Sequence, residues 1–282
     1  MNRRLFLLLF ALLVALLLGH QGLRPPAPPA HFAFGRGPDV VIVHGLGSTA
    51  QQWLPTARLL ARNFRVTLVD LPGHGLSPMP DPFSLDRAVA ALDRTLEEAA
   101  DRPVILVGHS LGGLVAAAEA LDHPERVRGL VLVETALRPQ VEPSQRAGLL
   151  ADLDRDYDGV LRSSYRAMGR DSAQGERLYQ EAAKLDPEAV KPWIRLAWIA
   201  DLSWEMRRLA PPLLAVLGPQ SWEPTEAWSH AAGALGYDGV PRIRPVRIEG
   251  CGHFIMLDRP GALADLIARF AANPEGEPVA AR

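Results

Sequence analysis

The stretch Gly108-His109-Ser110-Leu111-Gly112 is the strongest indication of fold in this chain, and it directly follows the apolar run Val104–Val107. It has the G-x-S-x-G form of a tight turn that carries a serine between a strand and a helix. The run before it is typical of a short buried strand, and Leu114–Leu121 after it is typical of a helix. A side chain at 108 or 112 would collide with the adjacent strand and helix, so we expect glycine to be required there. The turn then holds Ser110 in a strained conformation with its hydroxyl exposed.

Outward from this turn, strand-like and helix-like segments alternate from residue 39 onward. Such alternation is typical of an α/β fold, in which helices cover both faces of a parallel sheet. The pattern breaks between 139 and 205, where the chain is charged and helical in character, and we interpret this block as a helical insertion over the sheet. The predicted strands are 40–43, 65–69, 103–107, 127–133, 213–217 and 243–248, and the predicted helices are 51–62, 84–100, 114–121 and 263–271.

Ser110 needs a base to take its proton, because a hydroxyl is a weak nucleophile on its own. His253 is the candidate, since its loop after the last predicted strand lies at the same edge of a parallel sheet as the serine turn. If this serine attacks a carbonyl carbon, the reaction is acyl transfer, which also needs N–H donors for the negative oxygen of the transition state. The backbone N–H groups of Leu46 and Leu111 are the candidates for this oxyanion hole.

A serine and a histidine that catalyse acyl transfer need a third group, a carboxylate that orients the histidine. The chain offers two candidates for this carboxylate. After the predicted strand 213–217, an aspartate would be expected at position 221, where the chain has serine. Glu223 lies two residues further on. Glu134 lies at the end of the preceding predicted strand, at the same sheet edge as the serine turn. We favour Glu134 as the acid, with Glu223 as the alternative.

The loop that carries Leu46 also fits a different chemistry. Residues 45–50 read Gly-Leu-Gly-Ser-Thr-Ala, which fits the dinucleotide fingerprint G-x-G-x-x-A after a strand, and Asp70 ends the next predicted strand. Against this alternative, Asp70 runs directly into a tight turn at 71–75 that it can brace, and a nicotinamide site leaves the serine turn and the histidine loop unexplained. We expect no cofactor, and no metal, because no cluster with metal-ligand spacing is visible.

The N-terminus is distinct from the rest of the chain. Arg3 and Arg4 precede an unbroken apolar run, residues 5–18, which is the pattern of an export signal and is shorter than the roughly 20 residues of a membrane span. No clear cleavage site follows, so residues 1–22 are interpreted as a signal peptide or a short membrane anchor. Residues 23–37 are interpreted as a proline-rich spacer. We expect an exported protein, periplasmic or extracellular, or one held at a membrane through residues 5–18.

Composition sets the broad class. The 282 residues are 48% hydrophobic, which is enough for one large domain with its own core. The net charge of −2 gives no reason to expect a nucleic-acid partner. Cys251 is the single cysteine, so no intrachain disulfide forms, and we interpret it as a small buried residue. Nothing in the sequence indicates an oligomeric state.

Four motifs together resemble the α/β-hydrolase superfamily, in the order that family uses: His44–Gly47, Asp70–Gly75, Gly108–Gly113 and Gly252–Phe254. The resemblance implies a mostly parallel eight-stranded sheet with a helical cap. The core would comprise 38–138 and 206–272, and the cap 139–205. Independently of the resemblance, we expect the tail 273–282 to be disordered. Ser110 would be the nucleophile, His253 the base, and Leu46 and Leu111 the oxyanion donors. Serine at 221 departs from the commonest acid position, whereas some members, including haloalkane dehalogenases and certain lipases, have the acid where Glu134 lies.

The function implied is hydrolysis of carboxylic esters, with thioesters and lactones as further small-molecule substrates, through an acyl-enzyme and a Ser-His-acid triad. Carbon–carbon bond hydrolases and cofactor-free haloperoxidases use the same triad and stay open as alternatives. A non-catalytic binding protein is a third, supported only by the absent aspartate at 221. Six aromatic residues of the predicted cap are candidates for an acyl pocket or for packing: Tyr157, Tyr165, Tyr179, Trp193, Trp198 and Trp204.

Overall fold

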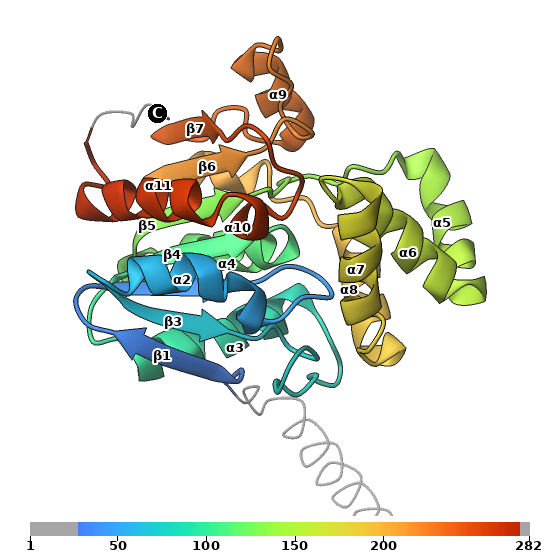
Figure 1. Ribbon diagram of the computed structural model, residues 1–282, viewed down its shortest axis with the longest axis horizontal. Helices are drawn as coiled ribbons and strands as arrows, with labels where there is room; N and C mark the ends of the chain where they lie inside the picture. Colours follow the sequence, from blue (N-terminus) through green and yellow to red (C-terminus); the bar gives the residue numbers. More distant parts are fainter. Residues whose placement is uncertain (1–27, 277–282) are drawn as a thin grey trace, which may run out of the picture.

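The computed structural model describes residues 28–276, which form a sheet of seven strands in the order β1-β3-β2-β4-β5-β6-β7 (Figure 1). β1 pairs with β3 antiparallel, and every other neighbouring pair is parallel. The mostly parallel sheet expected from the alternating pattern is confirmed, and all six predicted strands are present. The strand bounds are β1 His31–Gly35, β2 Asp39–Val43, β3 Arg65–Val69, β4 Val104–His109, β5 Val127–Val133, β6 Leu213–Leu217 and β7 Ile243–Arg247.

The antiparallel edge corrects two expectations. The resemblance implies eight strands, whereas residues 28–276 form seven, because the described chain supplies only β1 ahead of β2. β1 also falls inside the segment 23–37 that was interpreted as a spacer. Its residues are mostly exposed, so it lacks the apolar pattern that marks a buried strand. The predicted signal peptide or anchor at 1–22 lies outside the described residues, as does the spacer up to residue 27.

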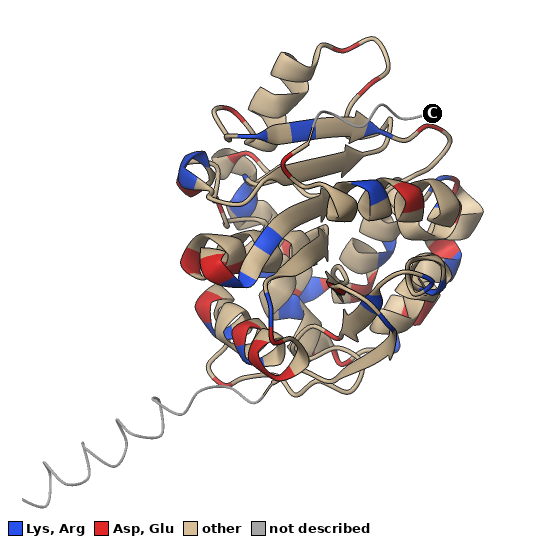
Figure 2. Cartoon of the chain, turned by 90° about the vertical axis from the view of Figure 1, so that its left-hand side faces the viewer, with Lys and Arg blue, Asp and Glu red and all other residues tan. Residues whose placement is uncertain are grey.

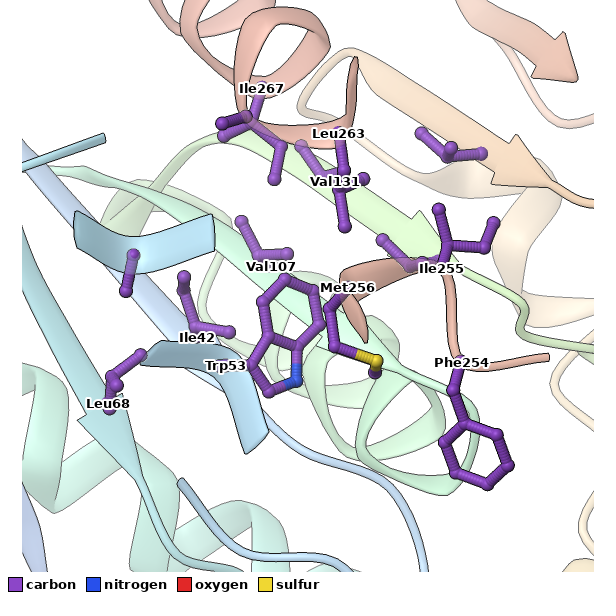
Figure 3. Close-up of a cluster of buried hydrophobic side chains, with 14 of the residues drawn as sticks. Ile42, Trp53, Leu68, Val107, Val131, Phe254, Ile255, Met256, Leu263 and Ile267 are labelled. Atoms are coloured by element: carbon purple, nitrogen blue, oxygen red, sulfur yellow. The ribbon is translucent and has the colours of Figure 1, made fainter. Parts of the chain in front are cut away.

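Helices cover both faces of the sheet: α2 (Leu54–Leu60), α10 (Ile255–Asp258) and α11 (Pro260–Ala272) on one face, and α3 (Leu85–Ala99) and α4 (Leu111–Asp122) on the other. Strand residues alternate between the two cores. Val40 and Ile42 of β2 belong to the cluster under α2 and α11, part of which is drawn in Figure 3. Val41 and Val43 belong to the cluster under α3 and α4. Burial on both faces explains why these strands read as continuous apolar runs.

Four helices leave the sheet between β5 and β6 and form the cap: α5 (Pro143–Arg155), α6 (Tyr157–Met168), α7 (Ser172–Ala182) and α8 (Pro187–Ala197). Figure 1 shows them together on the right-hand side of the sheet. An N-cap aspartate directly precedes each of α6, α7 and α8, and its side chain accepts a backbone N–H of the first turn, which explains where these helices start. All four helices lie inside the predicted insertion 139–205.

The remaining elements are short: η1 (Ala50–Trp53), η2 (Pro124–Arg126), η3 (Glu205–Arg208) and α9 (Trp228–Leu235).

Order extends into the segment 273–282 that was expected to be disordered, because Arg242 pairs with Glu275 at 2.8 Å and Arg244 donates to the Pro274 carbonyl. The rest of that tail, from 277, lies outside the described residues. Figure 2 shows both positively and negatively charged residues on the helices that face the viewer. None of the helices within residues 28–276 is long and apolar enough to span a bilayer.

Candidate active site

Loops at the carboxyl ends of neighbouring strands bring the predicted residues to one edge of the sheet. Ser110 follows β4, Glu134 follows β5, and the loop that begins at Gly218 follows β6. His253 lies between β7 and α10. Because β4 to β7 are parallel, their carboxyl ends lie side by side, which is where open α/β sheets carry their ligand sites.

Ser110 has φ 50° and ψ −120°, a backbone conformation that non-glycine residues rarely adopt. Its N–H donates to the Val133 carbonyl at 2.9 Å, which extends the β4–β5 ladder past the end of β4. A Cβ on Gly108 would lie 2.5 Å from the backbone of α4, and one on Gly112 would collide with the His44 carbonyl. These contacts confirm that both glycines are required for the strand, turn and helix to approach this closely.

Glu134 has the same positive φ, 50°, directly after the next strand. Its N–H donates to the Val216 carbonyl at 2.9 Å. Its side chain is 1% exposed and accepts three hydrogen bonds. The Gly218 N–H donates to Oε1, while Ser221 Oγ at 2.7 Å and His253 Nδ1 at 3.0 Å donate to Oε2. Three donors offset the cost of burying this carboxylate and fix it against the imidazole.

The geometry brings only one of the two predicted acids to His253. Glu134 contacts the imidazole directly, whereas Glu223 is exposed and its backbone carbonyl accepts from the Arg247 guanidinium at 3.1 Å. Ser221, which stands where the resemblance implies an aspartate, uses its hydroxyl to hold Glu134. The non-catalytic alternative loses the observation on which it rested, because the imidazole has a carboxylate partner without an aspartate at 221.

The His253 loop is held by hydrogen bonds on both sides of the residue. Its N–H donates to the Met168 carbonyl at 3.0 Å, and its carbonyl accepts from His109 Nε2 at 3.0 Å. Burial, and then the neighbouring His253, keep the pKa of His109 well below its usual range, so this ring is neutral and its Nε2 carries the donated proton. We did not predict this role for His109. The sequence offered one signal for it: His109 directly precedes Ser110 at the end of a strand. Successive residues there point to opposite sides, so the His109 side chain was available for a contact different from that of Ser110.

Leu46 and Leu111 line the same cavity as Ser110. Leu111 is the first residue of α4, where a backbone N–H has no acceptor within its own helix. The Leu46 carbonyl accepts the Tyr165 hydroxyl at 2.7 Å, which ties this loop to α6 of the cap. An N–H at the positive end of a helix dipole is suited to stabilising a developing negative oxygen.

The loop that fits the dinucleotide fingerprint is braced from within the fold. Asp70 accepts the backbone N–H groups of Ala50 at 2.8 Å and of Leu76 at 3.3 Å. His74 Nε2 accepts the Gly47 N–H at 3.0 Å, and burial lowers the pKa of His74 to about 3, so the ring stays a neutral acceptor. Asp70 therefore braces the turn, as expected, and its carboxylate is engaged with backbone groups rather than presented to a ribose.

Ser110 and His253 open into a cavity of about 520 Å³ between the core and the cap. Its walls are mostly apolar, and α6 and α8 supply the cap side. Of the six aromatic candidates in the cap, Tyr165 and Trp198 line this cavity, while Trp193 is fully buried. The larger apolar lining residues are Leu46, Leu111, Leu114, Val141, Leu161, Met168, Ile194, Trp198, Leu235 and Phe254, and Ala136, Ala197 and Ala234 complete the apolar wall.

Cys251 lies close to the triad loop without taking part in it. Its thiol donates to the Ile248 carbonyl at 3.0 Å. Burial, and then the negative charge of Glu134, raise the pKa of the Cys251 thiol to about 12. A thiol that stays protonated is a poor nucleophile, which agrees with its interpretation as a buried structural residue.

Comparison with known proteins places this geometry in a family. The profile described as "Alpha/beta hydrolase family" matches residues 40–266. The pimeloyl-[acyl-carrier protein] methyl ester esterase of Xanthomonas axonopodis pv. citri is 31% identical over 255 residues, covering 85% of this chain and 97% of that protein. The protein of the same name from Vibrio cholerae is 34% identical over 200 residues, covering 65% and 76%.

Solved structures share the fold. A hydrolase from Oleispira antarctica superposes with a TM-score of 0.74 at 18% identity, covering 87% of this chain and 95% of that one. The expected enzyme class, hydrolases that cleave carboxylic esters, is also the class in the names of the relatives. The profile match spans the predicted core and cap together. The chain therefore belongs to the α/β hydrolase family.

Proposed function

We propose that the protein hydrolyses carboxylic esters through an acyl-enzyme formed on Ser110. The observation that carries this proposal is the 3.0 Å hydrogen bond between His253 Nδ1 and the buried Glu134 carboxylate, at the cavity that Ser110 lines. An ionised carboxylate only accepts hydrogen bonds, so Nδ1 carries the proton and Nε2 is the basic nitrogen.

The reaction then follows in two halves. His253 Nε2 takes the Ser110 proton as Oγ attacks the ester carbonyl, and the N–H groups of Leu46 and Leu111 stabilise the negative oxygen. Glu134 stabilises the imidazolium, which gives its proton to the departing alcohol. Water next gives a proton to His253 and attacks the acyl carbonyl, and the proton returns to Ser110 as the acid leaves.

The cavity supports an aliphatic acyl group as substrate. Its walls are mostly apolar, and its volume is within the usual range for a small-molecule site. The relatives are named for cleaving a methyl ester of an acyl chain. We extend this to an ester of a small alcohol on a medium-length acyl chain, which the cap helices α6 and α8 would enclose.

Labelling with a fluorophosphonate probe, combined with p-nitrophenyl esters of increasing chain length, tests the proposal. Wild-type protein is expected to be labelled and to be most active on medium chains, and Ser110→Ala to lose both, with kcat at least about 10³-fold lower. Ser164→Ala is the matched control, because Ser164 also lines the cavity but its hydroxyl donates to the Val160 carbonyl at 2.9 Å. Absence of turnover on every ester, with activity on a vinylogous diketone, would move the proposal to carbon–carbon bond hydrolysis.

We propose in addition that residues 1–22 direct the protein out of the cytoplasm, as a cleaved signal or as a short anchor. The basic pair and the apolar run 5–18 support this. Mass spectrometry of the mature N-terminus in cell fractions tests it. An intact N-terminus on protein from the soluble cytoplasmic fraction would contradict it.

A further inference from the structure

A second group of titratable side chains lies at the end of α4 remote from Ser110. Asp93 comes from α3, while Glu119 and His123 come from the last turn of α4 and its C-cap, four residues apart and so on one face. One oxygen or ring nitrogen of each residue lies within 4.8 Å of the others. α4 has 12 residues and is about 18 Å long at 1.5 Å per residue, so this group is separate from the cavity.

Glu119 is the unusual member of the group. Its side chain is 0% exposed, and neither carboxylate oxygen has a hydrogen-bond partner among residues 28–276. A buried carboxyl without partners is unfavourable in either protonation state, because the proton of the neutral acid still needs an acceptor. The Glu119 carboxyl faces Asp93 and His123, so a bound ligand there would satisfy it.

The charges around Glu119 favour a cation. Asp93, Asp122 and Glu125 all act on it with negative charge, and Arg126 is the guanidinium that opposes them. That guanidinium already pairs with Asp93 at 2.7 Å. The carbonyl end of α4 adds the negative end of a helix dipole. Burial, followed by Asp93, raises the pKa of the Glu119 carboxyl to about 8.

We propose that Asp93, Glu119 and His123 bind a Zn²⁺-type divalent ion that fastens α3 to the end of α4. Three atoms within 4.8 Å of one another all lie within about 2.8 Å of a common point, and zinc bonds to nitrogen and oxygen are about 2.0–2.2 Å, so each side chain moves by less than roughly 1 Å. An imidazole ligand favours zinc over magnesium and calcium, which prefer oxygen. The side chains of Asp93 and His123 are 17% and 37% exposed, which leaves an entry path and room for water as a further ligand.

Thermal unfolding of the full chain, freed of metal by a chelator and then titrated with ZnCl₂, tests this site. Wild-type Tm is expected to rise by about 5–10 °C at a hundredfold excess over Kd. Glu119→Gln keeps the size of the side chain without its charge, and is expected to lose the rise. His123→Gln, at a partly exposed position, is a second variant that decides the matter where Glu119→Gln does not fold. Glu97→Gln is the matched control, since Glu97 also pairs with Arg126 but lies outside the proposed ligand set, and it keeps the full rise.

Two results would overturn the proposal. One is a wild-type Tm that ZnCl₂ does not change. The other is a rise of equal size in Glu119→Gln or His123→Gln, which would assign the zinc to another pair, such as His230 with Glu226. MgCl₂ at the same concentration is expected to leave Tm unchanged, and an equal rise with magnesium would overturn the assignment to a nitrogen-containing site.

Discussion

Glu134→Gln tests the proposed acid directly, because glutamine keeps the size of the side chain and removes its charge. Gly218 donates to one oxygen, and Ser221 and His253 donate to the other, so after the change three donors meet a single acceptor oxygen. If the amide oxygen faces Gly218, the NH₂ group faces the imidazole. Nδ1 must then accept, which puts the proton on Nε2, where the base is needed. If the oxygen faces His253, the tautomer is kept but the charge that stabilises the imidazolium is lost.

Either orientation predicts a large fall in turnover. We expect kcat to drop about 10³- to 10⁴-fold, equivalent to about 4–5.5 kcal/mol of transition-state stabilisation. The fold itself should survive, because the replacement is isosteric. The free energy of unfolding should fall by about 1.5–3 kcal/mol, the usual worth of a hydrogen bond to a charged group. The effect on catalysis is therefore expected to exceed the effect on stability.

Initial rates on a medium-chain p-nitrophenyl ester, together with urea unfolding, measure both effects. Glu223→Gln is the matched control: its side chain is exposed, and its kcat should stay within about twofold of wild type. The reasoning would be refuted if the kcat of Glu134→Gln stayed within about tenfold of wild type while Glu223→Gln lost its activity. The acid would then be assigned to the loop after β6.

Three further predictions follow from contacts described above. Adding Ser221→Asp to Glu134→Gln restores a carboxylate beside the imidazole, and should recover kcat at least about tenfold over the single variant; no recovery would mean that the loop cannot carry the acid. Tyr165→Phe removes the hydroxyl that holds the Leu46 carbonyl, and should lower kcat about threefold to tenfold, the worth of one hydrogen bond; unchanged ester kinetics would contradict a role for the cap in setting that loop. The unfolded chain protonates His74 near pH 6.5 but the folded protein only near 3, so the free energy of unfolding falls as pH drops through this window, by up to about 1.4 kcal/mol per unit. His74→Gln should flatten this slope in urea titrations at pH 6.5 and 4.5, and an unchanged slope would refute it.

Local chemistry explains why part of the site was predictable from the chain. The turn around Ser110 can be recognised in the sequence because glycine is required at both of its ends, where any Cβ would collide with neighbouring atoms. The strands also leave a trace, since burial on both faces demands continuous apolar runs. β1 leaves almost none, because its residues are mostly exposed and its position depends on pairing with β3.

The sequence alone could not decide which carboxylate partners His253. Glu134 and Glu223 both follow strands at the same edge, and only the path of each loop decides which carboxylate reaches His253. His109 shows the same limit, because its bond to the His253 carbonyl joins residues from different loops. Glu119 and His123 are recognisable as a pair on one helix face, but Asp93 joins them only through the packing of α3 on α4.

The position of the acid after β5 has a structural consequence for the nucleophile. The Val133 carbonyl accepts the Ser110 N–H, and the next residue, Glu134, donates its own N–H to Val216 of β6. The nucleophile is thus hydrogen-bonded to the residue that directly precedes the acid, and both have φ 50° directly after consecutive parallel strands. A shift of β5 in register would move the serine turn and the carboxylate together. Ser221 lies in the loop after the next strand, β6, and its hydroxyl donates to the Glu134 carboxylate. A hydroxyl is sufficient at this position because the carboxylate already comes from the residue after β5.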